Sequence, residues 1–245
     1  GSGAGRAARS PRVWIILPFL FVALYIPYKF WRETRFGEAL SDAQIREYAA
    51  DVLHPRQAQH ALVQISERLN RDPKAALSFA ELLTDLAAHE KTEIRSTVAW
   101  VLGQGERNKG FHDLLSVLAR DSEPLVRYNA ALGLASYQDV SARPVLRAML
   151  APYEVLSPVE GQMVDAIGRG KPVAVGTALA VILTAAGEET RVPSPLGGKI
   201  AGQSAILGQA IHKGDPLGVI SPSVEQVWEA LRGLFLVGTS EDLEA

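Results

Sequence analysis

The residue types that most often hold metals or perform catalysis are sparse in this chain and lie far apart. The sequence has no cysteine, which excludes disulfides, thiolate metal sites and cysteine nucleophiles. None of the histidines pairs with another at the spacing that metal ligands adopt. They are His54, His60, His89, His112 and His212. His89 precedes Glu90, but a single His-Glu pair does not make an iron site. We therefore expect no metal and no cofactor.

One glycine-rich stretch could in principle bind phosphate. The sequence "GRGKPVAVG" at 168–176 combines glycines with a lysine. It lacks the GxxxxGKS or GxxxxGKT spacing that surrounds phosphates with backbone amides and a lysine. No Ser/His/Asp set and no pair of carboxylates stands out elsewhere in the sequence. We therefore expect no catalytic residues, and we predict that the chain is not an enzyme.

The glycines of that stretch belong to a repeated pattern of short strands. "SPVEGQM" at 157–163 recurs as "SPLGGKI" at 194–200, and "VAVGTALAVI" at 173–182 recurs as "IHKGDPLGVI" at 211–220. Each half of the pattern indicates a strand, a glycine turn and a second strand. We therefore expect an all-β domain with two similar halves over residues 152–222.

This doubled pattern resembles the biotinyl/lipoyl family, also called the barrel-sandwich hybrid. The resemblance implies a hairpin tip that carries a modified lysine, eight residues before the proline of the second motif. Counting back from Pro195 gives Gly187, and the nearest lysines, Lys171 and Lys199, lie elsewhere in the pattern. We therefore expect a domain without a covalent cofactor. Unmodified domains of this family occur in membrane-fusion or adaptor subunits, which implies a role in packing against other proteins.

A second repeat, with an offset of 32 residues, occupies the middle of the chain. "FAELLTDLA" at 79–87 aligns with "FHDLLSVLA" at 111–119, and "EIRSTVAWVLG" at 93–103 aligns with "LVRYNAALGLA" at 125–135. Because both segments match at one offset, each unit is predicted to be a helix pair that packs on the next pair. The unit at 121–150 resembles a HEAT repeat. The resemblance implies a short α-solenoid over residues 38–151 that presents a surface to another protein.

An uncharged stretch near the start of the sequence, "VWIILPFLFVALYIPY" at 13–28, is long enough for a membrane anchor. As a helix it spans about 24 Å, and flanking residues extend it towards the roughly 30 Å of the hydrocarbon core. We predict a single transmembrane anchor over residues 13–31. The alternatives are a cleaved secretory signal and a buried core helix. The residues expected to place the anchor in the membrane are Trp14, Pro18, Tyr25, Tyr28 and Trp31.

Basic residues flank this stretch on both sides. Arg6, Arg9 and Arg12 lie in a Gly/Ala/Arg tail over residues 1–12, and Lys29 follows the apolar stretch. We expect these side chains to contact lipid headgroups or acidic protein surface. Equal numbers of basic residues on the two sides leave the orientation open by the charge rule. We expect the inner membrane, with the folded domains on the periplasmic side.

Residues 223–245 are predicted to form a C-terminal helix that packs on the folded part of the chain. Ser223 and Gln226 form a capping-box pattern at its start. The helix is expected to cover either the helical repeats or the open edge of the β domain. Trp228 lies beside its apolar stripe, which we expect to be in the core. The stripe consists of Val227, Leu231, Leu234 and Phe235.

Together these segments predict an α+β multi-domain protein with a single transmembrane helix, a short HEAT-like α-solenoid, an all-β barrel-sandwich hybrid and a C-terminal helix. The net charge of -2 gives no indication of a nucleic-acid partner. We predict a non-catalytic accessory or scaffolding subunit, anchored in the bilayer, that stabilises or positions an integral membrane protein complex, photosynthetic or respiratory. The alternative is a periplasmic adaptor or assembly factor of a transport or export system. The short gap between the β halves, residues 183–193, argues against a tunnel-forming adaptor, because the β domain of such adaptors is split by a long helical hairpin.

Overall fold

The computed structural model describes residues 25, 39–51, 53–72, 75–104, 107–239 and 242 of the chain. The chain divides into two compact units, residues 1–61 and 62–245. The described part of the first unit contains α2 (Asp42–Ala49) and the start of α3 (Pro55–Arg71). A capping box between Ser41 and Gln44 begins α2, since each side chain binds the backbone N–H of the other residue.

The fold class expected from the sequence needs correction. The described residues form a mixed helix-and-sheet structure, and no helix among them is both long and apolar enough to cross a membrane. The predicted anchor over residues 13–31 and the tail over residues 1–12 lie outside the described residues, apart from Tyr25, which is helical and 47% exposed. The longest described helix, α3, has 17 residues and carries four arginine and glutamate side chains, those of Arg56, Glu67, Arg68 and Arg71. For the described residues, the fold class is therefore corrected to a mixed helix-and-sheet structure without a transmembrane helix.

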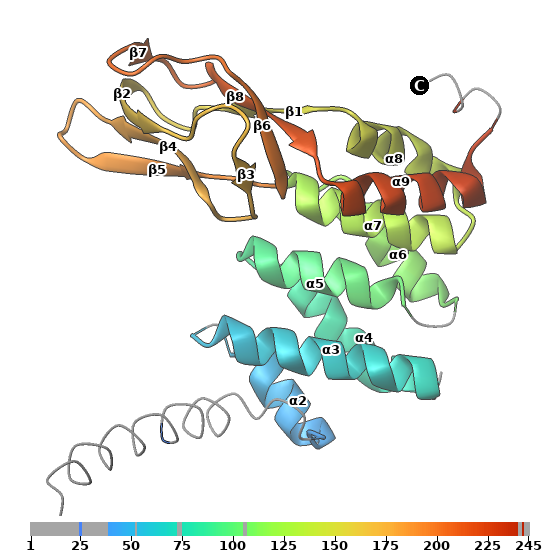
Figure 1. The fold of residues 1–245 in the computed structure, drawn as a ribbon. Coiled ribbons are helices and arrows are strands. Elements are labelled where there is room, and N and C mark those ends of the chain that lie inside the picture. The colour runs from blue at the N-terminus through green and yellow to red at the C-terminus, as the bar shows by residue number, and fades with distance from the viewer. Residues whose placement is uncertain are drawn as a thin grey trace, which may run out of the picture. The chain divides into compact units, whose positions relative to one another are not determined.

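The helices of the second unit pack in pairs. The first helix of a pair packs on the second, as α6 does on α7, and the second helices also pack on one another, as α5 does on α7 (Figure 1). Aligned positions of the repeat are buried in both first helices, at Phe79 and Leu83 in α4 and at Phe111 and Leu115 in α6. The helices are α4 (Ala75–Ala87), α5 (Thr92–Leu102), α6 (Lys109–Leu118), α7 (Pro124–Ser136), the 3-10 turn η1 (Val140–Ala142) and α8 (Arg143–Leu150).

The strands that follow α8 form two antiparallel sheets of four strands, in the orders β1-β8-β6-β3 and β5-β4-β2-β7. The two sheets share one apolar core, to which Val155, Ile200 and Ile220 contribute from one sheet and Met163 and Ile182 from the other. The strands are β1 (Tyr153–Leu156), β2 (Gly161–Ala166), β3 (Pro172–Val173), β4 (Ala178–Leu183), β5 (Glu189–Pro193), β6 (Gly198–Gln203), β7 (Ala210–Ile211) and β8 (Pro216–Pro222). We call this segment, Tyr153–Pro222, the β module.

The two halves of the β module are equivalent. The strands β1, β2, β3 and β4 of the first half correspond to β5, β6, β7 and β8 of the second. When each strand is exchanged for its counterpart, the strand order of one sheet becomes that of the other. The hydrogen bonds repeat as well: the buried Ser157 hydroxyl donates to the Val159 carbonyl, and the buried Ser194 hydroxyl donates to the Leu196 carbonyl, both at 2.6 Å. The repeated sequence motif therefore corresponds to a repeated local structure with its own buried hydrogen bonds.

The last helix, α9 (Val224–Val237), returns from the β module to the helices and packs on α7 and α8. Its Gly233 lies against the Leu146 side chain of α8, just as Gly133 of α7 lies against the Leu115 side chain of α6. In both helices the glycine allows close contact with the preceding helix of the pair. We therefore describe α8 and α9 as a third helix pair, with the β module inserted between its two helices (Figure 1).

Candidate functional site

The position aligned with the carrier lysine, Gly187, lies at the tip of the β4–β5 hairpin. Its N–H donates to the Thr184 carbonyl at 2.9 Å, and the Thr184 N–H donates to the Glu188 carbonyl at the same distance. Gly187 has a φ of +80°, which favours glycine, and a Cβ atom there would meet nothing within 4 Å. The tip lies at the end of the β module away from α8 and α9 (Figure 1). It is an exposed turn with no lysine.

The histidines take part in local contacts of the helices and turns. His54 and His112 lie 2.7 Å and 2.8 Å from a carboxylate oxygen of Asp51 and Asp139, respectively. His89 accepts a hydrogen bond from the Lys91 backbone N–H, which precedes α5. Within the part of the chain that the structure describes, no group of three His, Cys, Asp or Glu side chains could hold a metal ion.

An ion pair links consecutive helix pairs. The Arg95 guanidinium donates two hydrogen bonds to Asp121, at 2.7 Å and 2.9 Å, and their side chains are only 14% and 11% exposed. Arg95 also donates to the His89 and Glu90 carbonyls, and Arg127 repeats this contact with the Asp121 and Ser122 carbonyls. The bidentate contact with Arg95 lowers the pKa of Asp121. Arginine at this repeat position thus binds the loop before its helix, and Arg95 also connects that loop to the next pair.

An open cleft of about 400 Å³ lies between the β module and the N-terminal ends of α5 and α7. Its apolar lining includes Leu156 and Val175, which are 50% and 47% exposed. Three carboxylates stand at its rim, on Glu93, Glu123 and Glu154, and none forms an ion pair with another described residue. This combination suits a segment that carries both apolar and basic side chains.

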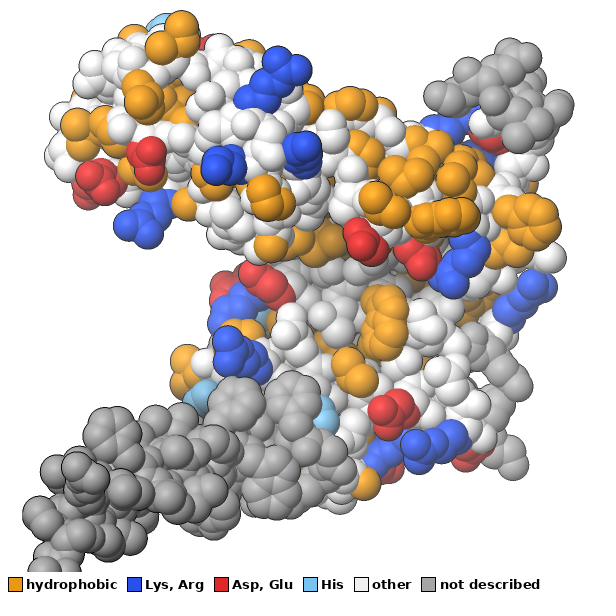
Figure 2. Space-filling model, in the orientation of Figure 1, with side chains coloured by type: hydrophobic (Ala, Val, Ile, Leu, Met, Phe, Trp, Pro, Cys, Tyr) orange, Lys and Arg blue, Asp and Glu red, His pale blue; other side chains and the backbone are white. Residues whose placement is uncertain are grey.

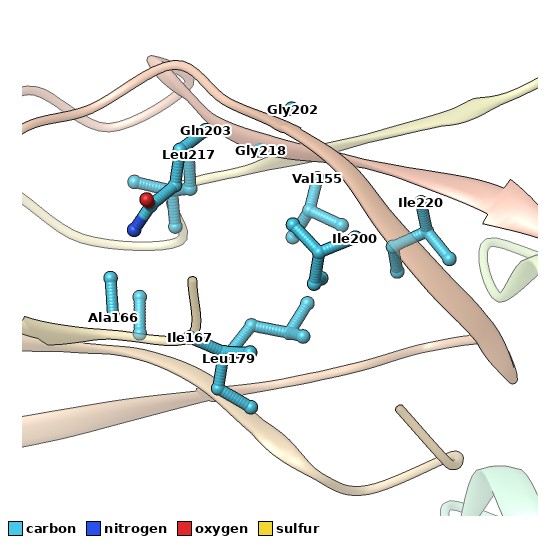
Figure 3. A pocket seen from close by; sticks show the side chains of 11 residues that line it. Val155, Ala166, Ile167, Leu179, Ile200, Gly202, Gln203, Leu217, Gly218 and Ile220 are labelled. Atoms are coloured by element: carbon cyan, nitrogen blue, oxygen red, sulfur yellow. The ribbon is translucent and has the colours of Figure 1, made fainter. Parts of the chain in front are cut away.

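A much smaller cavity lies inside the β module. It has a volume of about 20 Å³, and apolar side chains such as Val155, Leu179 and Ile200 point into it from both sheets (Figure 3). Gln203 supplies the polar side chain at its edge. A space of this size holds about one water molecule. We interpret it as a packing gap between the two sheets and not as a ligand site.

The outer face of α9 is apolar and exposed. The residues that face inwards and are buried are Ala230, Gly233, Leu234 and Val237. The prediction of a core stripe was therefore wrong for Leu231 and Phe235, because the helix is apolar on two sides and the small residues face the core. Hydrophobic side chains gather on the surface over α9 (Figure 2). We call the exposed residues the α9 stripe: Val224, Trp228, Leu231 and Phe235, which are 69%, 68%, 45% and 87% exposed.

Comparison with known proteins confirms the helical repeat. Residues 79–157 match the family model of HEAT repeats, which covers α5 to α8 and most of α4. The search of curated proteins gave no match. A solved structure of a single-chain, multi-domain long-chain acyl-CoA carboxylase is 16% identical over 37% of this chain, with a TM-score of 0.28. The match covers 10% of that protein. The resemblance of residues 152–222 to the biotinyl/lipoyl family stays a prediction.

Proposed function

We propose that this chain is a non-catalytic scaffold that holds a partner protein on its HEAT repeats. The match of residues 79–157 to HEAT repeats carries the proposal, because stacked helix pairs of this kind form extended protein-binding surfaces. The arrangement of α4 to α7 in stacked pairs supports it. The absence of enzymatic activity and an integral membrane complex as the partner stay predictions from the sequence.

The open cleft offers a place for the partner on this scaffold. Its carboxylates, on Glu93, Glu123 and Glu154, come from two consecutive helix pairs and from β1. A partner segment bound there would contact the HEAT repeats and the β module at once. The exposed side chains of Leu156 and Val175 supply apolar surface, and the carboxylates favour lysine or arginine in the partner. We therefore propose an extended, basic and partly apolar segment as the ligand of the cleft.

Co-purification tests this proposal. The full chain, tagged at its C-terminus, is purified from its native source, and any protein that accompanies it at fixed stoichiometry is quantified by mass spectrometry. The double variant Glu93→Lys, Glu154→Lys is expected to recover at least about tenfold less partner, because it reverses two charges at the rim. Glu189→Lys is the matched control, since Glu189 is exposed at the far hairpin of the β module and does not line the cleft.

The possible results distinguish failure of the scaffold proposal from failure of the assignment of the partner to the cleft. If no protein accompanies the wild-type chain at fixed stoichiometry, the scaffold proposal is overturned. If the double variant retains its partner as well as Glu189→Lys does, the scaffold stands and the assignment to the cleft is overturned. Far-UV circular dichroism of each variant confirms that the helices are intact.

A further inference from the structure

The α9 stripe occupies the position where a further helix pair would pack on the stack. The equivalent face of α5 is covered by α7: the Ser96 side chain and carbonyl accept hydrogen bonds from the Asn129 amide, and Gly103 lies against Gly133. In α7 the aligned residues, Tyr128, Ala131 and Ala135, are all at most 5% exposed, and α9 packs on that helix. The residues of α9 aligned with these three are Trp228, Leu231 and Phe235. They are exposed, and no described helix packs on that face of α9.

The outer face of α9 is apolar and is not covered by any other described element. It presents an indole and a phenyl ring, those of Trp228 and Phe235, at 68% and 87% exposure. Contiguous exposed surface of this kind marks an interaction site. The α9 stripe therefore continues a packing interface that is already used twice within the chain.

We propose that the α9 stripe binds the same stripe of a second copy of this chain, with the two helices antiparallel. The spacing of the stripe, at residues 224, 228, 231 and 235, is the same in both directions. Antiparallel pairing about its centre therefore places Trp228 of one copy against Leu231 of the other, and Phe235 against Val224. Each contact joins an aromatic side chain to a smaller aliphatic one, as interdigitated packing requires.

The charges beside the stripe are self-complementary in the same arrangement. Glu229 and Arg232 lie on one flank of α9, where their side chains form an ion pair at 2.7 Å within the chain. A twofold axis between antiparallel helices keeps this flank on the same side of the interface in both copies. Glu229 of one copy then lies within about one helical turn of Arg232 of the other. The apolar contacts and the charged flank therefore both favour the antiparallel pairing of the two α9 helices.

Light scattering on the purified full chain tests for the second copy. The expected mass is twice the 26.4 kDa of one chain, with dissociation on dilution. Leu231→Arg places a charge in the middle of the stripe and is expected to raise the dissociation constant at least about tenfold. Ile206→Arg is the matched control, because Ile206 is 75% exposed in the turn between β6 and β7 and is expected to leave the mass unchanged.

Cysteine cross-linking tests the orientation in a chain that has no native cysteine. A mixture of Val224→Cys and Phe235→Cys chains is expected to form a disulfide between the two variants, and neither variant is expected to cross-link alone. In the antiparallel pair, the two copies of position 224 are about 16 Å apart along the helices, beyond the roughly 7 Å between Cα atoms that a disulfide spans. A cross-link between two Val224→Cys chains would overturn the antiparallel pairing.

A monomeric mass at all concentrations overturns the proposal, and so does a ladder of ever larger species, which would show head-to-tail stacking. These results are distinguishable from failure of the scaffold function. Leu231→Arg is expected to recover the same partner protein as the wild type, because the cleft and the α9 stripe share no residue. Loss of both the dimer and the partner in this variant would contradict the separation of the two surfaces.

Discussion

The helical stack and the β module both consist of repeats, but they use repetition differently. In the stack each pair packs on the next: Arg95 forms an ion pair with Asp121 of the following pair, and Gly103 lies against Gly133. In the β module the two halves pack on each other, and each sheet takes strands from both halves. In the β module each half covers the inner apolar face of the other, whereas in the stack the outer face of α9 has no described helix on it. The exposed α9 stripe belongs to the first arrangement.

The largest expected effect tests the closed arrangement of the β module. In β6 a Cβ atom on Gly198 would lie 2.2 Å from the Ser221 carbonyl oxygen, and the backbone of β8 cannot move away without breaking the sheet. Gly198→Ala is expected to lower the free energy of unfolding by about 3 kcal/mol, measured by urea denaturation. Gly202→Ala in the same strand has open space around its Cβ and serves as the control. Similar stabilities of the two variants would contradict the close approach of β6 and β8.

The next effect tests the contact between consecutive helix pairs. Asp121→Ala removes the carboxylate from the nearly buried Arg95 and is expected to cost about 2 kcal/mol in the free energy of unfolding. Asp113→Ala is the control, because the Asp113 side chain is 65% exposed on the first helix of a pair, and it is expected to change this free energy by less than about 0.5 kcal/mol. Equal effects of the two variants would show that the ion pair does not hold the stack together.

The same contact predicts a pH dependence. Arg95 holds the pKa of Asp121 below its ordinary value in the folded chain, so the folded state binds a proton less readily than the unfolded state. The stabilisation by Asp121 is therefore complete above the unfolded pKa of about 3.9 and is lost as the pH falls through the lower folded value. The difference in stability between wild type and Asp121→Asn is expected to shrink in that range. A difference that grows towards acid pH would reverse the assigned sign.

The smallest expected effect tests whether the two halves of the β module are equivalent. Ser157→Ala and Ser194→Ala each remove one buried hydroxyl that donates to a carbonyl two residues ahead. Each is expected to cost about 1 kcal/mol, and the two losses are expected to agree, because the local structures are equivalent. Urea denaturation of both variants measures this agreement. Losses that differ by more than about 1 kcal/mol would show that the two halves are not equally packed.

The helical repeat could be predicted from sequence because its signal is local. The same apolar residues recur 32 residues apart in consecutive pairs, as Phe79 and Phe111 do. Their burial follows from the 3.6-residue period of a helix with one apolar face. Arg95 and Arg127 could likewise be aligned, although their carbonyl partners required the structure. The HEAT family model confirms this part of the prediction.

The third helix pair could not be predicted in the same way, because the β module separates its two helices in the sequence. A signal was nevertheless present: Ala230, Gly233 and Leu234 of α9 repeat the order of Ala130, Gly133 and Leu134 of α7, and all six are buried. Apolar residues on both faces of α9 hid this signal, since periodicity alone favoured the face with the larger side chains. Close packing on Leu146 selected the face with the small residues instead.

The insertion of the β module also sets the order of events when the chain is synthesised. Helix α8 leaves the ribosome before the β module, and α9 leaves after it, so the third pair stays incomplete until the strands are out. The pairing of Tyr153 with Ile220 joins the first strand of the module to the last. Folding of the module therefore shortens the loop between α8 and α9 and lowers the entropy lost when they meet. The folded β module therefore holds the start of α9 close to the end of α8.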